Sequence, residues 1–119
     1  MKDKLEPNMY VRTKWGYICK IININDFREP NMKYGVEASY LRDVMFIGDD
    51  DVVKASYNII DLIEKNDYIN GSWVNKIVDG KPIHEDYNDP FYSFGWENDD
   101  IKTVITHEQM EQMEYKVSD

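Results

Sequence analysis

Hydrophobic and polar residues alternate along short stretches of this chain, and glycine- or asparagine-containing turns separate the stretches. Residues 9–14 (MYVRTK) show the period-two pattern of a half-buried strand. Residues 17–24 (YICKIINI) are rich in β-branched and aromatic residues and predict a return strand after a tight turn at Trp15-Gly16. Residues 25–35 carry Asn, Asp, Pro and Gly and predict a loop. The first third of the chain therefore predicts a β-hairpin.

The middle of the chain predicts more strands and a second hairpin. Residues 44–47 (VMFI) predict a short buried strand, and residues 52–55 (VVKA) predict another strand after an acidic turn. Residues 58–63 predict a single helical turn. Asn-Gly between apolar runs is the strongest local hairpin signal, because a type I′ turn needs positive φ at both central residues. The turn at Asn70-Gly71 therefore places Tyr68 opposite Trp73.

Asp79-Gly80 predicts one more hairpin, between residues 76–78 and 81–83. Proline cannot donate to a strand ladder, so Pro82 predicts that the last of these strands lies at a sheet edge or ends early. Further strands are predicted at residues 91–94 and 101–105.

The end of the chain predicts a short helix over residues 107–113. Thr106 has the character of an N-cap, and Gln109 stands where a capping box requires Glu or Gln. Many short strands with regular turns predict a mainly β (small α+β) protein. Two architectures fit, an SH3-like barrel and a curved antiparallel sheet with one short C-terminal helix. A chain of 119 residues predicts a single domain over residues 1–119.

The net charge makes some classes of binding partner unfavourable. Fourteen basic residues against 23 acidic residues give −9 at neutral pH, which disfavours direct binding to nucleic acid or to an anionic membrane. No apolar run is long enough to span a bilayer, and the first six residues lack a signal-peptide core. A single cysteine, Cys19, excludes an internal disulfide and suits a reducing cytoplasm. We expect Cys19 to be a small buried hydrophobe.

No motif predicts catalysis, a cofactor or a metal. His84 and His107 are the only histidines, and no CxxC or HxxxH spacing accompanies them, so no metal site is expected. His107 is predicted to be solvent-exposed. The run Asp49–Asp51 lacks the spacing of a calcium loop and is interpreted as a solvated turn. Phosphate-binding glycine loops and nucleophile elbows are absent from the sequence. The protein is therefore expected not to be an enzyme.

One segment, residues 84–100, combines carboxylates with aromatic rings. In one interpretation it is an exposed loop whose aromatic residues fill the core of the protein. In the other it is an interface, where rings provide contact area and carboxylates attract a basic partner. The predicted partner-binding residues are Glu85, Asp86, Tyr87, Asp89, Phe91, Tyr92, Trp96, Glu97, Asp99 and Asp100.

The arginines suggest an alternative site. The chain has three, Arg12, Arg28 and Arg42, all in its first 42 residues. Arginine makes bidentate contacts to phosphate, so a converging set would bind an anionic small molecule such as a signalling nucleotide. The competing interpretation is that they serve surface solubility.

Three segments resemble small uncharacterised accessory proteins of phages and prophages from low-GC Gram-positive bacteria. They are residues 8–21 (NMYVRTKWGYICKI), 52–77 (VVKASYNIIDLIEKNDYINGSWVNKI) and 101–117 (IKTVITHEQMEQMEYKV). The middle segment, with its IIDLIExxDYxNG pattern, is the most specific. The resemblance implies a phage accessory protein in the cytoplasm of a bacterial host, and it carries over no catalytic residue.

The resemblance and the charge together favour a non-enzymatic, anti-CRISPR-like inhibitor of a host nucleic-acid-binding defence enzyme. Its carboxylates would attract the enzyme's basic surface. Three alternatives stay open at this point. They are a binder that sequesters a signalling nucleotide, a self-associating structural module of the phage, and a metal-dependent hydrolase that uses clustered carboxylates.

Overall fold

The computed structural model describes residues 4–39, 41–86, 88–89, 93–115 and 117. Its chain divides into two compact units, Met1–Leu62 and Ile63–Asp119. The single domain expected over residues 1–119 stays a prediction, because two compact units can belong to one domain. Among the described helices, none has the length and apolar character that a bilayer crossing requires.

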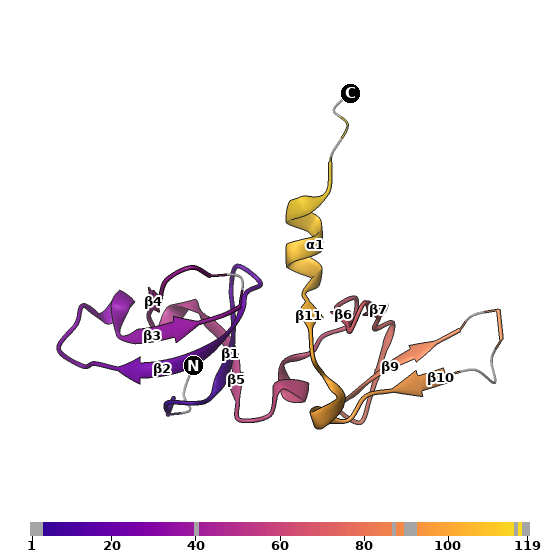
Figure 1. Cartoon of the computed structure of the whole chain (residues 1–119), viewed down its shortest axis with the longest axis horizontal. Coiled ribbons are helices and arrows are strands. Elements are labelled where there is room, and N and C mark those ends of the chain that lie inside the picture. Colours follow the sequence, from indigo (N-terminus) through magenta and orange to yellow (C-terminus); the bar gives the residue numbers. More distant parts are fainter. Residues whose placement is uncertain (1–3, 40, 87, 90–92, 116, 118–119) are drawn as a thin grey trace. The chain divides into compact units, whose positions relative to one another are not determined.

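The first unit is built on a five-stranded antiparallel sheet, with the strand order β4-β3-β2-β1-β5. Its strands are β1 (Tyr10–Thr13), β2 (Ile18–Ile24), β3 (Tyr34–Glu37), β4 (Met45–Ile47) and β5 (Val52–Ser56). The predicted hairpin of β1 and β2 is confirmed, and Gly16 supplies the positive φ of 87° at its turn. In Figure 1 β2 and β3 run side by side in this sheet.

Two predictions for this unit were wrong. Tyr34 and Gly35, expected in a loop, belong to β3, because Tyr34 buries its ring in the core. β4 was expected to be buried, yet it lies at the sheet edge and leaves Phe46 partly exposed. Successive side chains of a strand point to opposite faces, so Ile47 enters the core while Phe46 points to the other face.

The core of the first unit is one continuous apolar cluster. Val11 and Ile21, on neighbouring strands, are completely buried, and Val36 of β3 extends the cluster. Cys19 is buried in the same cluster, which confirms its predicted role as a small hydrophobe. Three 3₁₀ turns connect the strands: η1 (Pro30–Met32), η2 (Asp49–Asp51) and η3 (Ile59–Leu62). The last of these is the helical turn predicted over residues 58–63.

The second unit has two small antiparallel sheets, ordered β10-β9-β8 and β11-β6-β7. Their strands are β6 (Tyr68–Ile69), β7 (Ser72–Trp73), β8 (Lys76–Val78), β9 (Lys81–Glu85), β10 (Ser93–Gly95) and β11 (Val104–Ile105). The Asn70-Gly71 hairpin is confirmed, with φ of 51° and 82°, and Tyr68 pairs with Trp73 as predicted. A 3₁₀ turn, η4 (Asn98–Asp100), and the helix α1 (His107–Met113) complete the unit.

Pro82 lies in a central strand, which contradicts the prediction of an edge. β9 pairs with both β8 and β10, and the predicted turn at Asp79-Gly80 precedes it. Pro82 pairs with Ile77, at the position next to the hairpin's first hydrogen-bonded pair, where no hydrogen bonds to β8 are needed. On the other side, the ladder to β10 ends at Ile83. The missing N–H therefore falls outside both ladders.

Helix α1 begins as predicted at its Thr106 cap. The Thr106 hydroxyl accepts from the Gln109 N–H, and the Gln109 side chain accepts from the Thr106 N–H at 3.0 Å. Within the described residues no sheet closes into a barrel. The pairing register of the larger sheet shifts between Arg12 and Thr13 and between Ile21 and Asn23. The mainly β fold with one short C-terminal helix is confirmed, in its open-sheet form.

Candidate functional site

The predicted acidic and aromatic interface divides into a buried and an exposed part. Tyr87, Phe91 and Tyr92 lie outside the described residues. Trp96 is only 8% exposed and belongs to the small core of the second unit, where it packs edge-to-face on Phe94 at 5.0 Å. Its ring therefore stabilises the fold and offers little surface to a partner.

The carboxylates of this segment lie around that core with different partners. Glu85 pairs with Lys76 at 3.5 Å, and Glu97 pairs with Lys81 at 3.4 Å. Two others accept backbone N–H groups nearby: Asp86 from Asn88, and Asp100 from Glu97. Asp89 and Asp99 are exposed. The structure thus keeps several of these charges at the surface, and their role in partner binding stays a prediction.

Negative charge is concentrated in the second unit as a whole. Residues 63–119 contain 13 acidic and five basic residues, a formal charge of −8. Residues 1–62 contain ten acidic and nine basic residues, a formal charge of −1. Almost the entire net charge of −9 therefore comes from one unit, which gives the molecule a field that attracts basic partners.

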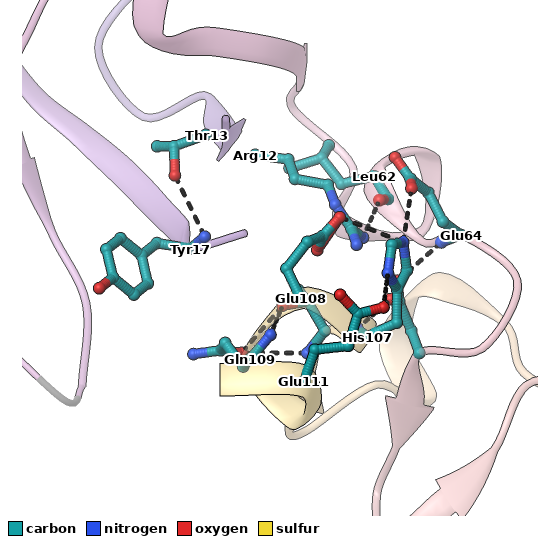
Figure 2. Close-up of polar contacts among 11 residues, drawn as sticks. Arg12, Thr13, Tyr17, Leu62, Glu64, His107, Glu108, Gln109 and Glu111 are labelled. Carbon is teal, nitrogen blue, oxygen red and sulfur yellow. Dashed lines mark hydrogen bonds and ion pairs between the residues drawn. The ribbon is translucent and has the colours of Figure 1, made fainter. Parts of the chain in front are cut away.

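The three arginines do not form a common pocket. Arg12 is 1% exposed on β1, and its Nη1 donates to the Leu62 carbonyl at 3.0 Å (Figure 2). Arg28 donates to the Asn23 side chain, and its guanidinium stacks over the Phe46 ring at 4.5 Å. Arg42 is exposed in the segment before β4. Each side chain thus lies in a different environment, and the nucleotide site suggested by the three arginines stays a prediction.

A groove in the first unit gathers exposed rings beside aspartates. A hollow of about 750 Å³ lies between the β1–β2 turn and the two 3₁₀ turns η1 and η2. Its apolar side chains are Trp15, Met32 and Phe46, which are 41%, 43% and 38% exposed. The carboxylates of the acidic turn η2 also line it. The sequence alone did not indicate this groove, because its residues come from the β1–β2 turn, from η1, from β4 and from η2.

Close backbone packing fixes one wall of the groove. At Gly48 an added Cβ would lie 2.4 Å from the Pro30 carbonyl oxygen, so only glycine permits η1 and η2 to approach this closely. Lys14 stacks on the Trp15 ring at 5.0 Å and also pairs with Asp51 at 2.9 Å. These contacts hold Trp15 next to the acidic turn.

Electrostatics of the acidic turn are set by its hydrogen bonds. The Gly48 N–H donates to Asp51, and this bond, together with Lys14, lowers the pKa of the Asp51 carboxyl. The Tyr34 hydroxyl donates to Asp49. Burial and this bond raise the pKa of Tyr34 above its usual value. The run Asp49–Asp51 is thus the turn that the sequence predicted, with two of its three carboxylates held in place.

A second candidate lies in the other unit, where three carboxylates surround His107. The His107 Nε2 is 3.1 Å from an oxygen of Glu64 and 3.1 Å from an oxygen of Glu108. On the other side of the ring, Nδ1 is 3.8 Å from Glu111 (Figure 2). The ligand atoms of Glu64, His107 and Glu108 lie within 4.8 Å of one another, the distance range of a metal-binding set. Among the described residues this is the one such group.

A buried aspartate holds the two segments of this group together. Asp67 is completely buried, and its carboxylate accepts from the Glu64 N–H at 2.7 Å and from the His107 N–H at 2.9 Å. The segment before β6 and the first turn of α1 are therefore fixed to one side chain. This bridge brings Glu64 next to His107 although they are 43 residues apart in the sequence.

His107, which was predicted to be solvent-exposed, is partly exposed and has charged neighbours. Its side chain is 31% exposed and lies between carboxylates from two segments. A partial signal was present locally, because Glu111 stands four residues after His107 and such pairs lie on one face of a helix. The other histidine, His84, lies between the Trp73 and Phe94 rings, with Nδ1 2.8 Å from the Trp73 carbonyl oxygen. It is a packing residue of the second unit.

Comparison with protein-family models, with curated proteins and with solved structures finds no match for this chain. The two candidate sites therefore stand on their geometry alone.

Proposed function

We propose that this protein is a non-enzymatic binding module whose groove holds a basic segment of a partner protein. The observation that carries the proposal is the groove of the first unit, where Trp15, Met32 and Phe46 are exposed beside carboxylates. Its lining contains three aspartates and one lysine. A lysine- or arginine-containing segment with an apolar side chain complements this surface in both charge and polarity.

The overall charge supports the same kind of partner. A molecule at −9 attracts a basic surface over a distance comparable to the Debye length, and this attraction raises the association rate at low ionic strength. Basic surfaces of this kind belong to enzymes that bind nucleic acid. Together with the resemblance to phage accessory proteins, this supports inhibition of a host defence nuclease, such as a CRISPR effector, as the function.

The test begins with affinity capture of the intact protein from host cells at low and at high ionic strength. We expect a basic nucleic-acid-binding protein that is retained at low salt and lost at high salt. The purified partner is then titrated with the wild-type chain and with Trp15→Ala. Truncating a central interface aromatic lowers affinity by roughly 30-fold or more.

Two matched variants decide which surface is used. Phe27→Ala removes an aromatic ring that is fully exposed outside the groove, so its affinity should equal that of the wild type. Glu97→Gln combined with Asp99→Asn tests the acidic segment predicted from the sequence. Loss of binding in this pair with no effect of Trp15→Ala would move the site to the second unit. Absence of any salt-sensitive protein partner would overturn the proposal.

A further inference from the structure

We infer that Glu64, His107 and Glu108 form a binding site for one divalent transition-metal ion, with Zn²⁺ as the probe of choice. The inference is independent of the proposed groove, because all three residues belong to the second unit. It rests on the donor set, on the distances between the donors and on the way the fold holds them.

The donor set has the chemistry of a zinc-type site. An imidazole nitrogen and two carboxylate oxygens suit borderline divalent ions, whereas Mg²⁺ and Ca²⁺ prefer oxygen donors alone. Three protein ligands leave a fourth position for water. The side chains are 31%, 28% and 28% exposed, so an ion has a path to them from solvent.

The distances fit a shared ion. Zinc lies about 2.0–2.2 Å from nitrogen and oxygen ligands, which places neighbouring ligand atoms of a tetrahedral site roughly 3.4 Å apart. His107 Nε2 is 3.1 Å from the nearest oxygens of both Glu64 and Glu108. A single ring nitrogen carries at most one proton and can direct it well at only one of two acceptors. A metal ion in place of this proton would bind both carboxylates and the nitrogen at once.

The surrounding residues resemble the support of a metal-bound histidine. Such a histidine usually directs its second ring nitrogen at a carboxylate, which fixes the orientation of the ring. Here Glu111 lies 3.8 Å from Nδ1, which is within ion-pair distance and longer than a hydrogen bond. The buried Asp67 carboxylate holds the backbone of both Glu64 and His107. The ligands therefore come from two segments that the fold already fixes.

The experiment is a calorimetric titration of the chelator-treated, tag-free full chain with Zn²⁺ alone. We expect one ion per chain. His107→Gln should lower the affinity at least 100-fold, and Glu64→Gln or Glu108→Gln at least tenfold. Glu114→Gln is the matched control, because it removes one negative charge from an exposed residue just beyond the same helix. Its affinity should equal that of the wild type.

A second measurement identifies the ligand directly. In a proton–carbon NMR spectrum, Zn²⁺ should shift the ring signals of His107 and leave those of His84 in place. This readout also applies to any variant whose circular dichroism shows that it is folded. Equal Zn²⁺ affinity of the wild type and His107→Gln, or a titration without saturable binding, would overturn the inference. In that case the cluster is a network of ion pairs around a protonated histidine.

Discussion

The two units of this protein are stabilised by different kinds of burial. The first buries a continuous cluster of nine residues under a five-stranded sheet. Among the described residues of the second unit the cluster has four members, and the strands are two to five residues long. In the described part of the second unit, hydrogen bonds from polar side chains add to this apolar burial.

These polar side chains form hydrogen bonds with backbone N–H and C=O groups of other segments. The Asn75 amide donates to the Glu85 carbonyl at 2.7 Å and accepts from the Glu85 N–H at 2.8 Å. Asn70 accepts from the Lys102 and Thr103 N–H groups. Asp67 does the same for two further N–H groups. Loops are thus joined where no strand ladder is available.

The two units also differ in their formal charge. The first unit is close to neutral and presents its rings in a groove, whereas the second carries a formal charge of −8. A unit held by buried hydrogen bonds tolerates a strongly charged surface, because surface charges act mainly through long-range repulsion that salt screens. The groove residues and most of the net negative charge therefore lie in different parts of the chain.

The largest expected loss of stability comes from creating a cavity in the apolar core of the first unit. Ile21→Ala should lower the free energy of unfolding by about 3–4 kcal/mol, since Ile21 is completely buried in the larger cluster. Ile69→Ala, at an equally buried position of the second unit, should cost about 2 kcal/mol, because a smaller cluster collapses more easily around the cavity. Urea denaturation measures both, and equal losses would break the comparison.

A smaller effect is expected from the polar support of the second unit. Asp67→Ala should cost about 2–3 kcal/mol, because it leaves the Glu64 and His107 N–H groups without their acceptor. Asp67→Asn retains one side-chain oxygen and should cost less. Hydrogen exchange resolved by mass spectrometry should show the loss of protection in residues 63–119 first. Protection lost equally across residues 4–62 would contradict separate modes of stabilisation.

The smallest effect concerns the acidic turn beside the groove. The folded-state pKa of Asp51 is lowered by the Gly48 N–H and by Lys14. Its contribution to stability is therefore present above the ordinary carboxyl pKa and is lost as the pH falls through the lowered value. Asp51→Asn should remove this part of the acid dependence, on the order of 1 kcal/mol or less. Asp50→Asn, with the same charge change at an exposed neighbour, should retain it in acid titrations of stability.

Local pattern was sufficient wherever the turn chemistry was strong. Asn70-Gly71 and Asp79-Gly80 form the predicted hairpins, because few residues accept two successive positive φ angles. Thr106 and Gln109 define the helix start for a similarly local reason. β3 escaped prediction because Tyr34 stands in a run rich in turn residues, and only its burial against the sheet makes the segment extended. The preferences of neighbouring residues contain no information about a tertiary contact such as the burial of Tyr34.

The candidate sites also depend partly on features that nearby residues determine and partly on contacts that only the tertiary structure makes. The amino-acid sequence by itself determined the acidity, the mainly β character, the hairpin turns and the capped helix, since each depends on composition or on residues a few positions apart. Only the tertiary structure decided that Trp96 is a core residue, that Arg12 is buried, and that Glu64 reaches His107. These outcomes depend on which loops the packing brings together, and spacing along the chain carries no information about that.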